Sequence, residues 1–145
     1  MNRTIIQILL LLLAFACQNA TQKKQESSSE NQGVPKFAFL QEFHNFGTLQ
    51  AGEIVAYSFQ FTNTGDGDLM IEKAESDCGC ITVEFPREAI QPGKTGYVEV
   101  IFNAAGEVGK VYKEIILYSN TEPDETKLAI AATVQNELIN IYSKN

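Results

Sequence analysis

The amino-acid sequence predicts an all-β protein, an immunoglobulin-like β-sandwich of about seven strands without the disulfide that joins the two sheets in antibody domains. Three observations predict this class. Apolar residues alternate with polar ones along several short segments, and clusters of glycine, proline and asparagine separate those segments. No window between residues 37 and 134 keeps the 3.6-residue period of a helix, which disfavours a fold that alternates strands and helices.

The expected strands follow one another along residues 37–134. In the first two segments, aromatic and branched residues occupy alternate positions, as in a strand with one buried face. The later segments repeat this pattern, and the segment at 111–118 is apolar on both faces. The expected strands are residues 37–43, 55–62, 69–71, 81–83, 98–102, 111–118 and 128–134.

The predicted connections between these strands are short. Residues 47–52 contain two glycines, and residues 63–68 contain Asn, Asp and Gly, which tolerate positive φ. Residues 91–94 read Gln-Pro-Gly-Lys, which fits a type II turn. The chain has no tryptophan, and no two cysteines in the expected sandwich are far enough apart to bridge its sheets. A disulfide-free sandwich is therefore favoured, with an oligonucleotide-binding type of barrel as the alternative.

Composition limits the partners of this domain. The chain has 145 residues, 11 basic and 18 acidic side chains, a formal net charge of −7 and three cysteines. It has no cluster of lysine and arginine like those that bind phosphate backbones. Nucleic acid is therefore not an expected partner.

Residues 1–16 have the order of a bacterial lipoprotein signal peptide. Arg3 supplies the positive start, a leucine-rich stretch follows, and Ala14-Phe15-Ala16 stands directly before Cys17. The apolar stretch is much shorter than the roughly 20 residues that a membrane-spanning helix needs. We expect Cys17 to be acylated and to become the first residue of the mature chain. The departure from the usual lipobox is Ala14, where leucine is common.

Two other readings of this segment stay open: ordinary signal cleavage near Ala16 and an uncleaved anchor. Lipid attachment at Cys17 predicts a cell-envelope location, and Gln18 in the next position permits sorting to the outer membrane, on its periplasmic or surface face. Residues 18–36 are polar and contain no aromatic residue, so they are expected to form a disordered tether.

The expected organisation is therefore a signal peptide at 1–16, a lipidated cysteine and tether at 17–36, a sandwich at 37–135 and a C-terminal extension at 136–145. Apolar residues in the extension fit a short helical turn, a strand extension or a tail that binds a partner.

A set of ordered motifs resembles a bacterial family. The set consists of His44-Asn45-Phe46-Gly47-Thr48-Leu49, Gly52-Glu53, Phe59-Gln60-Phe61-Thr62-Asn63-Thr64-Gly65, Leu69-Met70-Ile71, Cys78-Gly79-Cys80 and Ile90-Gln91-Pro92-Gly93. Together they resemble the domain-of-unknown-function family numbered fifteen seventy-three, which is common among exported lipoproteins of Gram-negative bacteria. The layout is also similar to major-sperm-protein-like and hydin-like immunoglobulin modules, and this resemblance implies binding to other proteins. The family usually has threonine directly after the second cysteine, whereas this chain has Ile81 there.

Cys78-Gly79-Cys80 is the most chemically informative motif in the expected sandwich, and a structural role is favoured over reactivity because Asp77 beside Cys78 disfavours a thiolate. In an extended strand the α-carbons of the two cysteines would lie about 6.5 to 7 Å apart, at the upper limit for a disulfide, and Gly79 can bend the backbone to close the gap. An oxidising envelope favours a local disulfide, structural or redox-active. The alternatives are a reduced pair that binds a soft metal such as copper(I), inert thiols, and intermolecular pairing.

Other candidate sites have ordinary structural explanations. His44 is the only histidine and is expected at the surface or at a sheet edge. Asn63, Asp66 and Asp68, with Glu75 and Asp77, offer oxygen atoms for calcium, but turn geometry explains the run and the EF-hand spacing is absent. No nucleophile stands out, since no Gly-x-Ser-x-Gly elbow is present.

The function expected from the sequence is that of a lipid-anchored envelope module without catalytic activity or a required cofactor. It would contact a protein partner through sandwich edges or pole loops, with edge-strand addition as the favoured mode. The alternative is thiol-redox or copper(I) handling by Cys78 and Cys80. Carbohydrate capture by tyrosines such as Tyr57, Tyr97 and Tyr112 ranks last.

Overall fold

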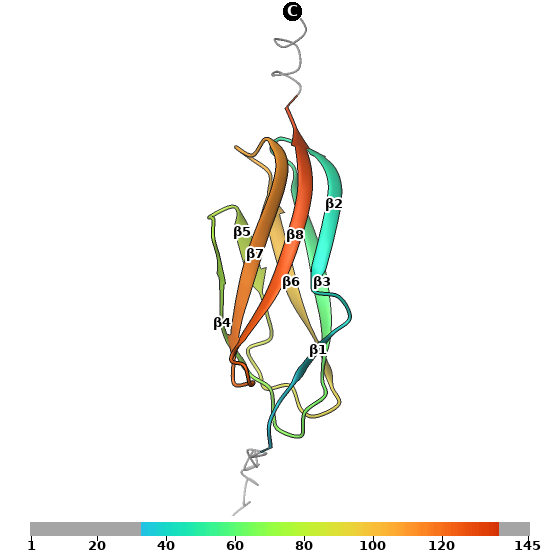
Figure 1. Ribbon diagram of the computed structural model, residues 1–145, viewed down its shortest axis with the longest axis vertical. Helices are drawn as coiled ribbons and strands as arrows, with labels where there is room; N and C mark the ends of the chain where they lie inside the picture. The colour runs from blue at the N-terminus through green and yellow to red at the C-terminus, as the bar shows by residue number, and fades with distance from the viewer. Residues whose placement is uncertain (1–32, 137–145) are drawn as a thin grey trace, which may run out of the picture.

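The computed structural model describes residues 33–136, which form eight strands in two stacked four-stranded sheets (Figure 1). The first sheet contains β1 (Phe37–Phe39), β3 (Ile54–Asn63), β6 (Thr95–Asn103) and β5 (Ile81–Glu84), in that order. The second contains β2 (Phe43–Gln50), β8 (Glu125–Gln135), β7 (Gly109–Ser119) and β4 (Ile71–Ser76), in that order. The predicted all-β sandwich is confirmed. The expected signal peptide, Cys17 and most of the tether and C-terminal extension lie outside the described residues.

The core lies between the sheets, where alternate residues of each central strand are buried. Phe59 and Phe61 of β3 pack with inward residues of β6, and the opposite sheet contributes branched aliphatic residues of β7 and β8. The period of two in the sequence therefore identifies the inner face correctly. The largest fully buried apolar side chains are Phe59, Phe61, Phe102, Leu69, Ile115, Leu117, Leu128, Ile130, Val98, Val100 and Val134.

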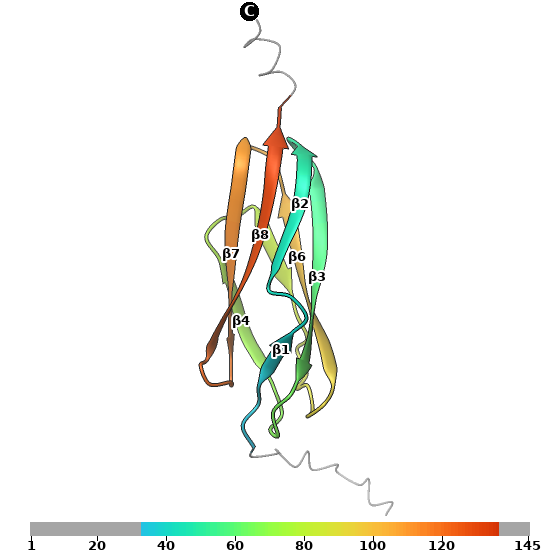
Figure 2. The same ribbon diagram turned by 45° about the vertical axis from the view of Figure 1, so that its right-hand side comes forward.

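The segment predicted as one strand at 37–43 is divided between the two sheets. β1 pairs antiparallel with β3, and the chain then crosses at residues 40–42 so that β2 pairs parallel with β8 (Figure 2). The crossing is held by Leu40, whose N–H donates to the Gln60 carbonyl at 3.0 Å, and by Glu42, whose carbonyl accepts from the Ala129 N–H at 2.8 Å. This crossing gives eight strands where the sequence predicted about seven.

The predicted connection at 47–52 is only partly correct. Residues 47–50 belong to β2, and the turn is limited to the residues that follow. The register of β2 on β8 shifts between Asn45 and Thr48, and Gly47 has a φ of 74° within this bulge. Gly47, which in the sequence suggested a turn, instead permits a β-bulge within β2.

The other predicted turns agree better with the structure. Lys94 donates its N–H to the Gln91 carbonyl at 3.0 Å, and Gly93 has a φ of 75°, as a type II turn requires. The expected strand at 69–71 begins later: Leu69 forms only an isolated bridge to Ile90, and β4 runs from Ile71 to Ser76.

The start of β1 and the end of β8 lie at opposite ends of the sandwich (Figure 1). The pole from which residues 33–36 emerge also holds the loops at 64–70, 85–94 and 120–124. No helix within residues 33–136 is long and apolar enough to span a bilayer.

Candidate functional site

Cys78 and Cys80 lie in the loop between β4 and β5 and are joined in a disulfide. Their α-carbons are 5.2 Å apart, closer than in an extended strand, because the loop turns at Gly79. Both residues are half-buried against the core. Ser76 Oγ donates to the Cys78 carbonyl at 3.0 Å, and the Asn103 N–H donates to the Cys80 carbonyl at 2.9 Å. The backbone on both sides of the disulfide is therefore fixed to the sandwich.

In this state the two sulfur atoms are bonded to each other, so neither is a thiolate that could bind a metal. Soft-metal binding by this pair would first require reduction. Among residues 33–136, no group of three or more His, Cys, Asp or Glu side chains is arranged to hold a metal ion.

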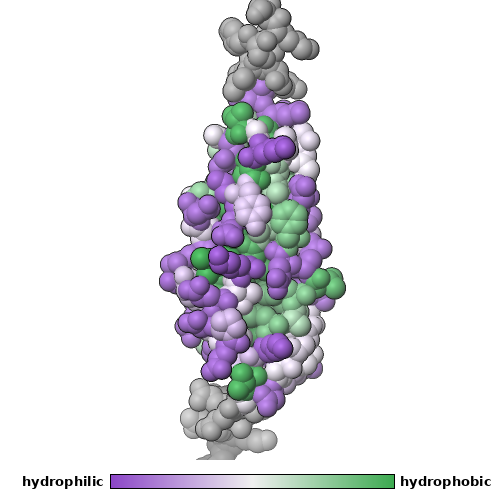
Figure 3. Space-filling model, in the orientation of Figure 1, coloured by the Kyte–Doolittle hydropathy of each residue, from purple (hydrophilic) through white to green (hydrophobic). Residues whose placement is uncertain are grey.

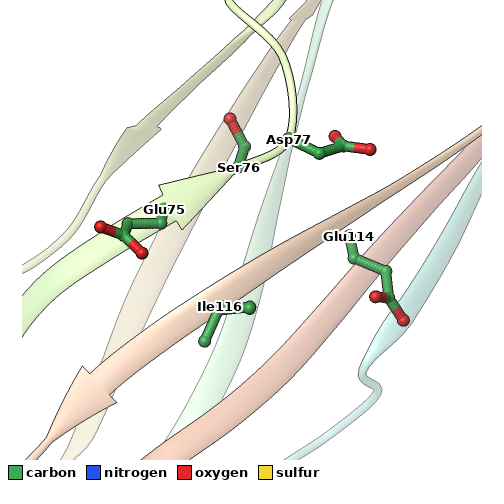
Figure 4. Close-up of a pocket in the computed structure, with 5 residues that line it drawn as sticks. All are labelled: Glu75, Ser76, Asp77, Glu114 and Ile116. Carbon is green, nitrogen blue, oxygen red and sulfur yellow. The ribbon is translucent and has the colours of Figure 1, made fainter.

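An acidic cleft of about 220 Å³ lies where β4 ends beside β7 (Figure 4). It is lined by Glu75, Ser76, Asp77, Glu114 and Ile116, and the three carboxylates point in different directions. Two of the carboxylates already have cations: Lys73 Nζ lies 2.7 Å from Glu75 Oε1, and Lys127 Nζ lies 3.7 Å from Glu114 Oε2. The Lys73 ammonium, which donates a hydrogen bond to Glu75, lowers the pKa of that carboxyl. The carboxylates of this cleft therefore do not converge on a point at which they could bind a cation together.

The calcium candidates at residues 63–68 have a structural role instead. The Asn63 side chain is fully buried, and its Oδ1 accepts from the N–H groups of Lys36 and Gly65 at 3.2 and 3.0 Å. Its Nδ2 donates to the carbonyls of Gly67 and Ile90, both at 2.8 Å. Because both Asn63 polar atoms bind backbone groups, the amide oxygen is not available to a cation.

Residues 33–36 pack tightly against this loop, and we call the joined segments the N-terminal clasp. Asp66 Oδ1 accepts from the Val34 N–H at 2.7 Å, and the Asp66 N–H donates to the Val34 carbonyl at 3.2 Å. A β-carbon on Gly65 or Gly67 would collide with the backbone of residues 33–35. The clasp therefore fixes the point at which the preceding segment joins the sandwich, which the sequence had suggested only as a turn.

His44 lies on the edge strand β2, in agreement with its expected place, but it is not simply exposed. Its ring stacks on Tyr57 of the other sheet with a centroid distance of 3.7 Å and an interplanar angle of 10°. Phe46 packs edge-on against it at 4.7 Å, and Gln41 Nε2 donates to the Tyr57 hydroxyl at 2.7 Å. The only histidine therefore helps to close this side of the sandwich.

Burial lowers the pKa of His44 below its ordinary value of 6.5. Below about pH 6.5 the unfolded chain then binds more protons at this position than the folded chain. Stability is therefore lost as the pH falls from about 6.5 towards the lower folded-state pKa. We expect His44→Phe, which keeps a stacking ring, to lose less stability than the parent between pH 7.5 and 5.0 in urea titrations. Equal losses in the two proteins would contradict this prediction.

A larger groove of about 400 Å³ lies where the edge strand β5 leads into the loop before β6. Its lining includes the apolar residues Phe85, Pro86, Ile90 and Tyr97 and the acidic residues Glu84 and Glu99. Sequence reasoning missed this groove because its two walls are about ten residues apart in the chain and meet only through the β5–β6 pairing. Of these residues, Ile90 belongs to the family motif at 90–93, and only Tyr97 was expected to contact a ligand, as a candidate for carbohydrate contact.

The outer face of the second sheet carries a further exposed aromatic pair. Phe43 of β2 pairs with Ala129 of β8, and Tyr112 of β7 pairs with Ala131 on the other side of β8. The two rings stack with their centroids 6.4 Å apart. Figure 3 shows green and white atoms gathered on the β2 and β8 side of this face, and mostly purple atoms towards β4. The face is therefore unevenly apolar.

Two stacked sheets, with β1 in the first, β2 in the second and β2 parallel to β8, define an immunoglobulin-like sandwich. The chain belongs to the family described as "Protein of unknown function (DUF1573)", whose model matches residues 37–134. The resemblance in the sequence motifs is thus confirmed, while the family description supplies no activity.

Solved structures share this fold at low sequence identity. A Porphyromonas gingivalis W83 protein of unknown function has a TM-score of 0.60 and 17% identity, over 76% of this chain and 51% of that one. A PapD-like domain of human CEP192 has a TM-score of 0.57 and 11% identity, over 70% of this chain and 86% of that one. The secreted serine protease VesC of Vibrio cholerae has a TM-score of 0.52 and 14% identity, over 72% and 24%.

These similarities establish the fold alone. The chain spans about half the length of the Porphyromonas gingivalis protein and about a quarter of VesC. No sequence among the curated proteins matches the chain.

Proposed function

We propose that this protein is a lipid-anchored binding or assembly module of the cell envelope that has no catalytic activity and contacts a partner protein. The observation that carries the proposal is the groove beside β5 and β6. It is lined by the end of the edge strand β5, by the pole loop that follows and by the start of β6. Tyr97 in this groove is 54% exposed. An exposed aromatic residue in a concave, largely apolar site is typical of a contact surface.

The geometry of the edges favours side-chain contacts over addition of a long strand. β1 and β5 are only 3 and 4 residues long, and β2 contains a bulge. β4 carries Glu72, Lys73 and Glu75 on a strand of 6 residues. Short, bulged and charged edges all limit main-chain pairing with another chain. Of the two surfaces expected from the sequence, the pole loops and the groove beside them are therefore the better candidates.

Attachment through Cys17 is supported by the sequence that precedes the N-terminal clasp. A polar segment without aromatic residues leads from Cys17 to Gly33, where the clasp begins. A mature chain that starts at an acylated Cys17 would be held to the outer membrane by that segment. Intact mass of the protein from its native membrane tests this directly. A mature chain that starts at any other residue, or a Cys17 without acyl chains, would contradict lipid anchoring.

Site-specific photo-crosslinking in intact cells tests partner binding. A benzophenone amino acid would replace Tyr97 in the groove, and a matched control would replace Tyr112 on the opposite sheet. We expect a discrete crosslinked band from position 97 that is reduced when Cys17→Ala removes the anchor. Absence of a discrete product at both positions would contradict a binding role.

The proposal of a non-catalytic role rests on the arrangement of the polar residues. His44 is engaged by aromatic rings, Asn63 by backbone groups, and Cys78 and Cys80 by each other. Within the described residues these candidates do not come together as nucleophile, base and orienting group.

The disulfide supports a second candidate function, thiol-disulfide exchange with an envelope partner. Cys78 and Cys80 are only partly buried, so a partner thiolate could reach them without unfolding of the core. Thiol titration of the purified chain after graded reduction would decide. A pair that stays oxidised under mild reductant would rule out this role, whereas ready reduction with retention of the folded state would support it.

A further inference from the structure

The strongest unassigned feature is a pair of like charges in the groove. β5 and β6 are antiparallel, and their register places Glu84 directly opposite Glu99. Both side chains lie on the outer face, since they alternate with inward residues such as Val83 and Val98. Like charges directly opposite each other on neighbouring strands destabilise a sheet.

The two carboxylates are not engaged in an ion pair within the described residues. None of the ion pairs within residues 33–136 includes Glu84 or Glu99. Glu99 accepts a long hydrogen bond of 3.4 Å from Ser58 Oγ. The acidic cleft beside β7 differs in this respect, because lysines already pair with Glu75 and Glu114 there. The groove thus presents two carboxylates that form no ion pair within residues 33–136.

The rest of the groove suits the apolar part of a cationic side chain. Phe85, Pro86, Ile90 and Tyr97 provide apolar and aromatic surface beside the carboxylates. The Arg87 guanidinium already lies over the Phe85 ring, with its central carbon 4.2 Å from the ring centroid. Lysine and arginine have long apolar stems and charged heads, and both are attracted to aromatic faces.

We propose that this groove binds an extended segment of an envelope protein in which lysine or arginine stands next to an apolar residue. The cationic head lies between Glu84 and Glu99, and the stem and the apolar neighbour pack on Tyr97 and Phe85. A bare metal ion would gain nothing from the aromatic lining. The proposal rests on the binding role proposed above and adds to it the location and the chemistry of the partner.

The test uses the full-length chain in detergent and a blocked hexapeptide that contains two arginines and two leucines. A second peptide with glutamate in place of arginine is the charge control. We expect the arginine peptide alone to bind, with an affinity that falls as salt is added. The double variant Glu84→Gln, Glu99→Gln should weaken binding about tenfold or more, and Tyr97→Ala about fivefold.

The matched control is Glu75→Gln with Glu114→Gln, which removes the same charge from the acidic cleft and should leave the affinity unchanged within about twofold. Equal loss in both double variants would mean that net charge rather than the groove attracts the peptide, and would overturn the proposal. Unchanged binding in the Glu84→Gln, Glu99→Gln variant would also overturn it.

Stability gives an independent readout. Because the opposed carboxylates repel each other, Glu84→Gln should raise the urea midpoint of unfolding while it weakens peptide binding. A lower urea midpoint would show that the Glu84–Glu99 pair stabilises the fold. It would contradict the proposal that the pair serves to bind a cationic side chain. The crosslinking experiment does not depend on partner charge. A crosslink at position 97 without peptide binding would refute only this inference.

Discussion

Asn63→Ala is expected to lower the free energy of unfolding by about 3 kcal/mol, enough to shift the thermal midpoint by more than about 10 °C. The reason is the number of backbone groups that depend on one side chain. Asn63 is fully buried and accepts from or donates to Lys36, Gly65, Gly67 and Ile90. Alanine would leave these groups without their partner, and buried polar groups without hydrogen bonds are costly.

The matched control is Asn103→Ala. Asn103 is exposed, and its Oδ1 accepts from the Ala105 N–H at 2.9 Å. Its loss should therefore cost less than about 1 kcal/mol. Urea unfolding monitored by circular dichroism would compare the two variants. Similar losses of stability for Asn63→Ala and Asn103→Ala would contradict a central role for Asn63.

The same substitution should also release the N-terminal clasp. Asn63 accepts the Lys36 N–H, and the neighbouring Asp66 accepts the Val34 N–H. Amide hydrogen exchange at Val34 and Lys36 should therefore be faster in Asn63→Ala even where the sandwich is still folded. In a tethered protein, the clasp would determine the direction in which the domain leaves its anchor.

Phe61→Ala is expected to cost about 3 to 5 kcal/mol, the largest effect of a single truncation that we predict. Phe61 is 1% exposed, and its ring contacts Phe37 and Phe39 of β1 with centroid distances of 5.0 and 5.4 Å. Alanine would leave a cavity and remove the ring contacts that hold β1 against the core. Strand β1 makes only three residue pairs with β3, so it depends strongly on these contacts.

Phe43→Ala is the control for this truncation. It removes the same side chain from a position that is 49% exposed on the outer face of β2, and we expect a loss below about 1.5 kcal/mol. Chemical denaturation of the two variants would measure the difference. A loss for Phe61→Ala no greater than that for Phe43→Ala would show that the β3 ring does not organise the core.

Much of the fold could be read from local pattern. Alternation identified Phe59 and Phe61 as inward residues. The turn at Pro92-Gly93 followed because proline has a fixed negative φ and glycine permits the positive φ that a type II turn needs. The division of residues 37–43 between two sheets could not be read, because both halves have the same period of two. Whether a strand pairs with β3 or β8 depends on partners that are distant in sequence.

The candidate site was less accessible to sequence reasoning. The proximity of Cys78 and Cys80 followed from their spacing and the flexibility of Gly79, and the structure joins them. The stack of His44 on Tyr57 has no local signature, since the two rings come from different sheets. A cross-strand pair such as Glu84 with Glu99 becomes visible only when the register is known.

The sequence by itself determined the sandwich class, the inward faces of most strands, the family and the close pair of cysteines. Tertiary structure alone decided which strands are neighbours, and with them the clasp around Asn63 and the groove that holds Glu84, Glu99 and Tyr97. The physical reason is that periodicity records burial at each position, whereas binding surfaces depend on which distant segments pair and in which register.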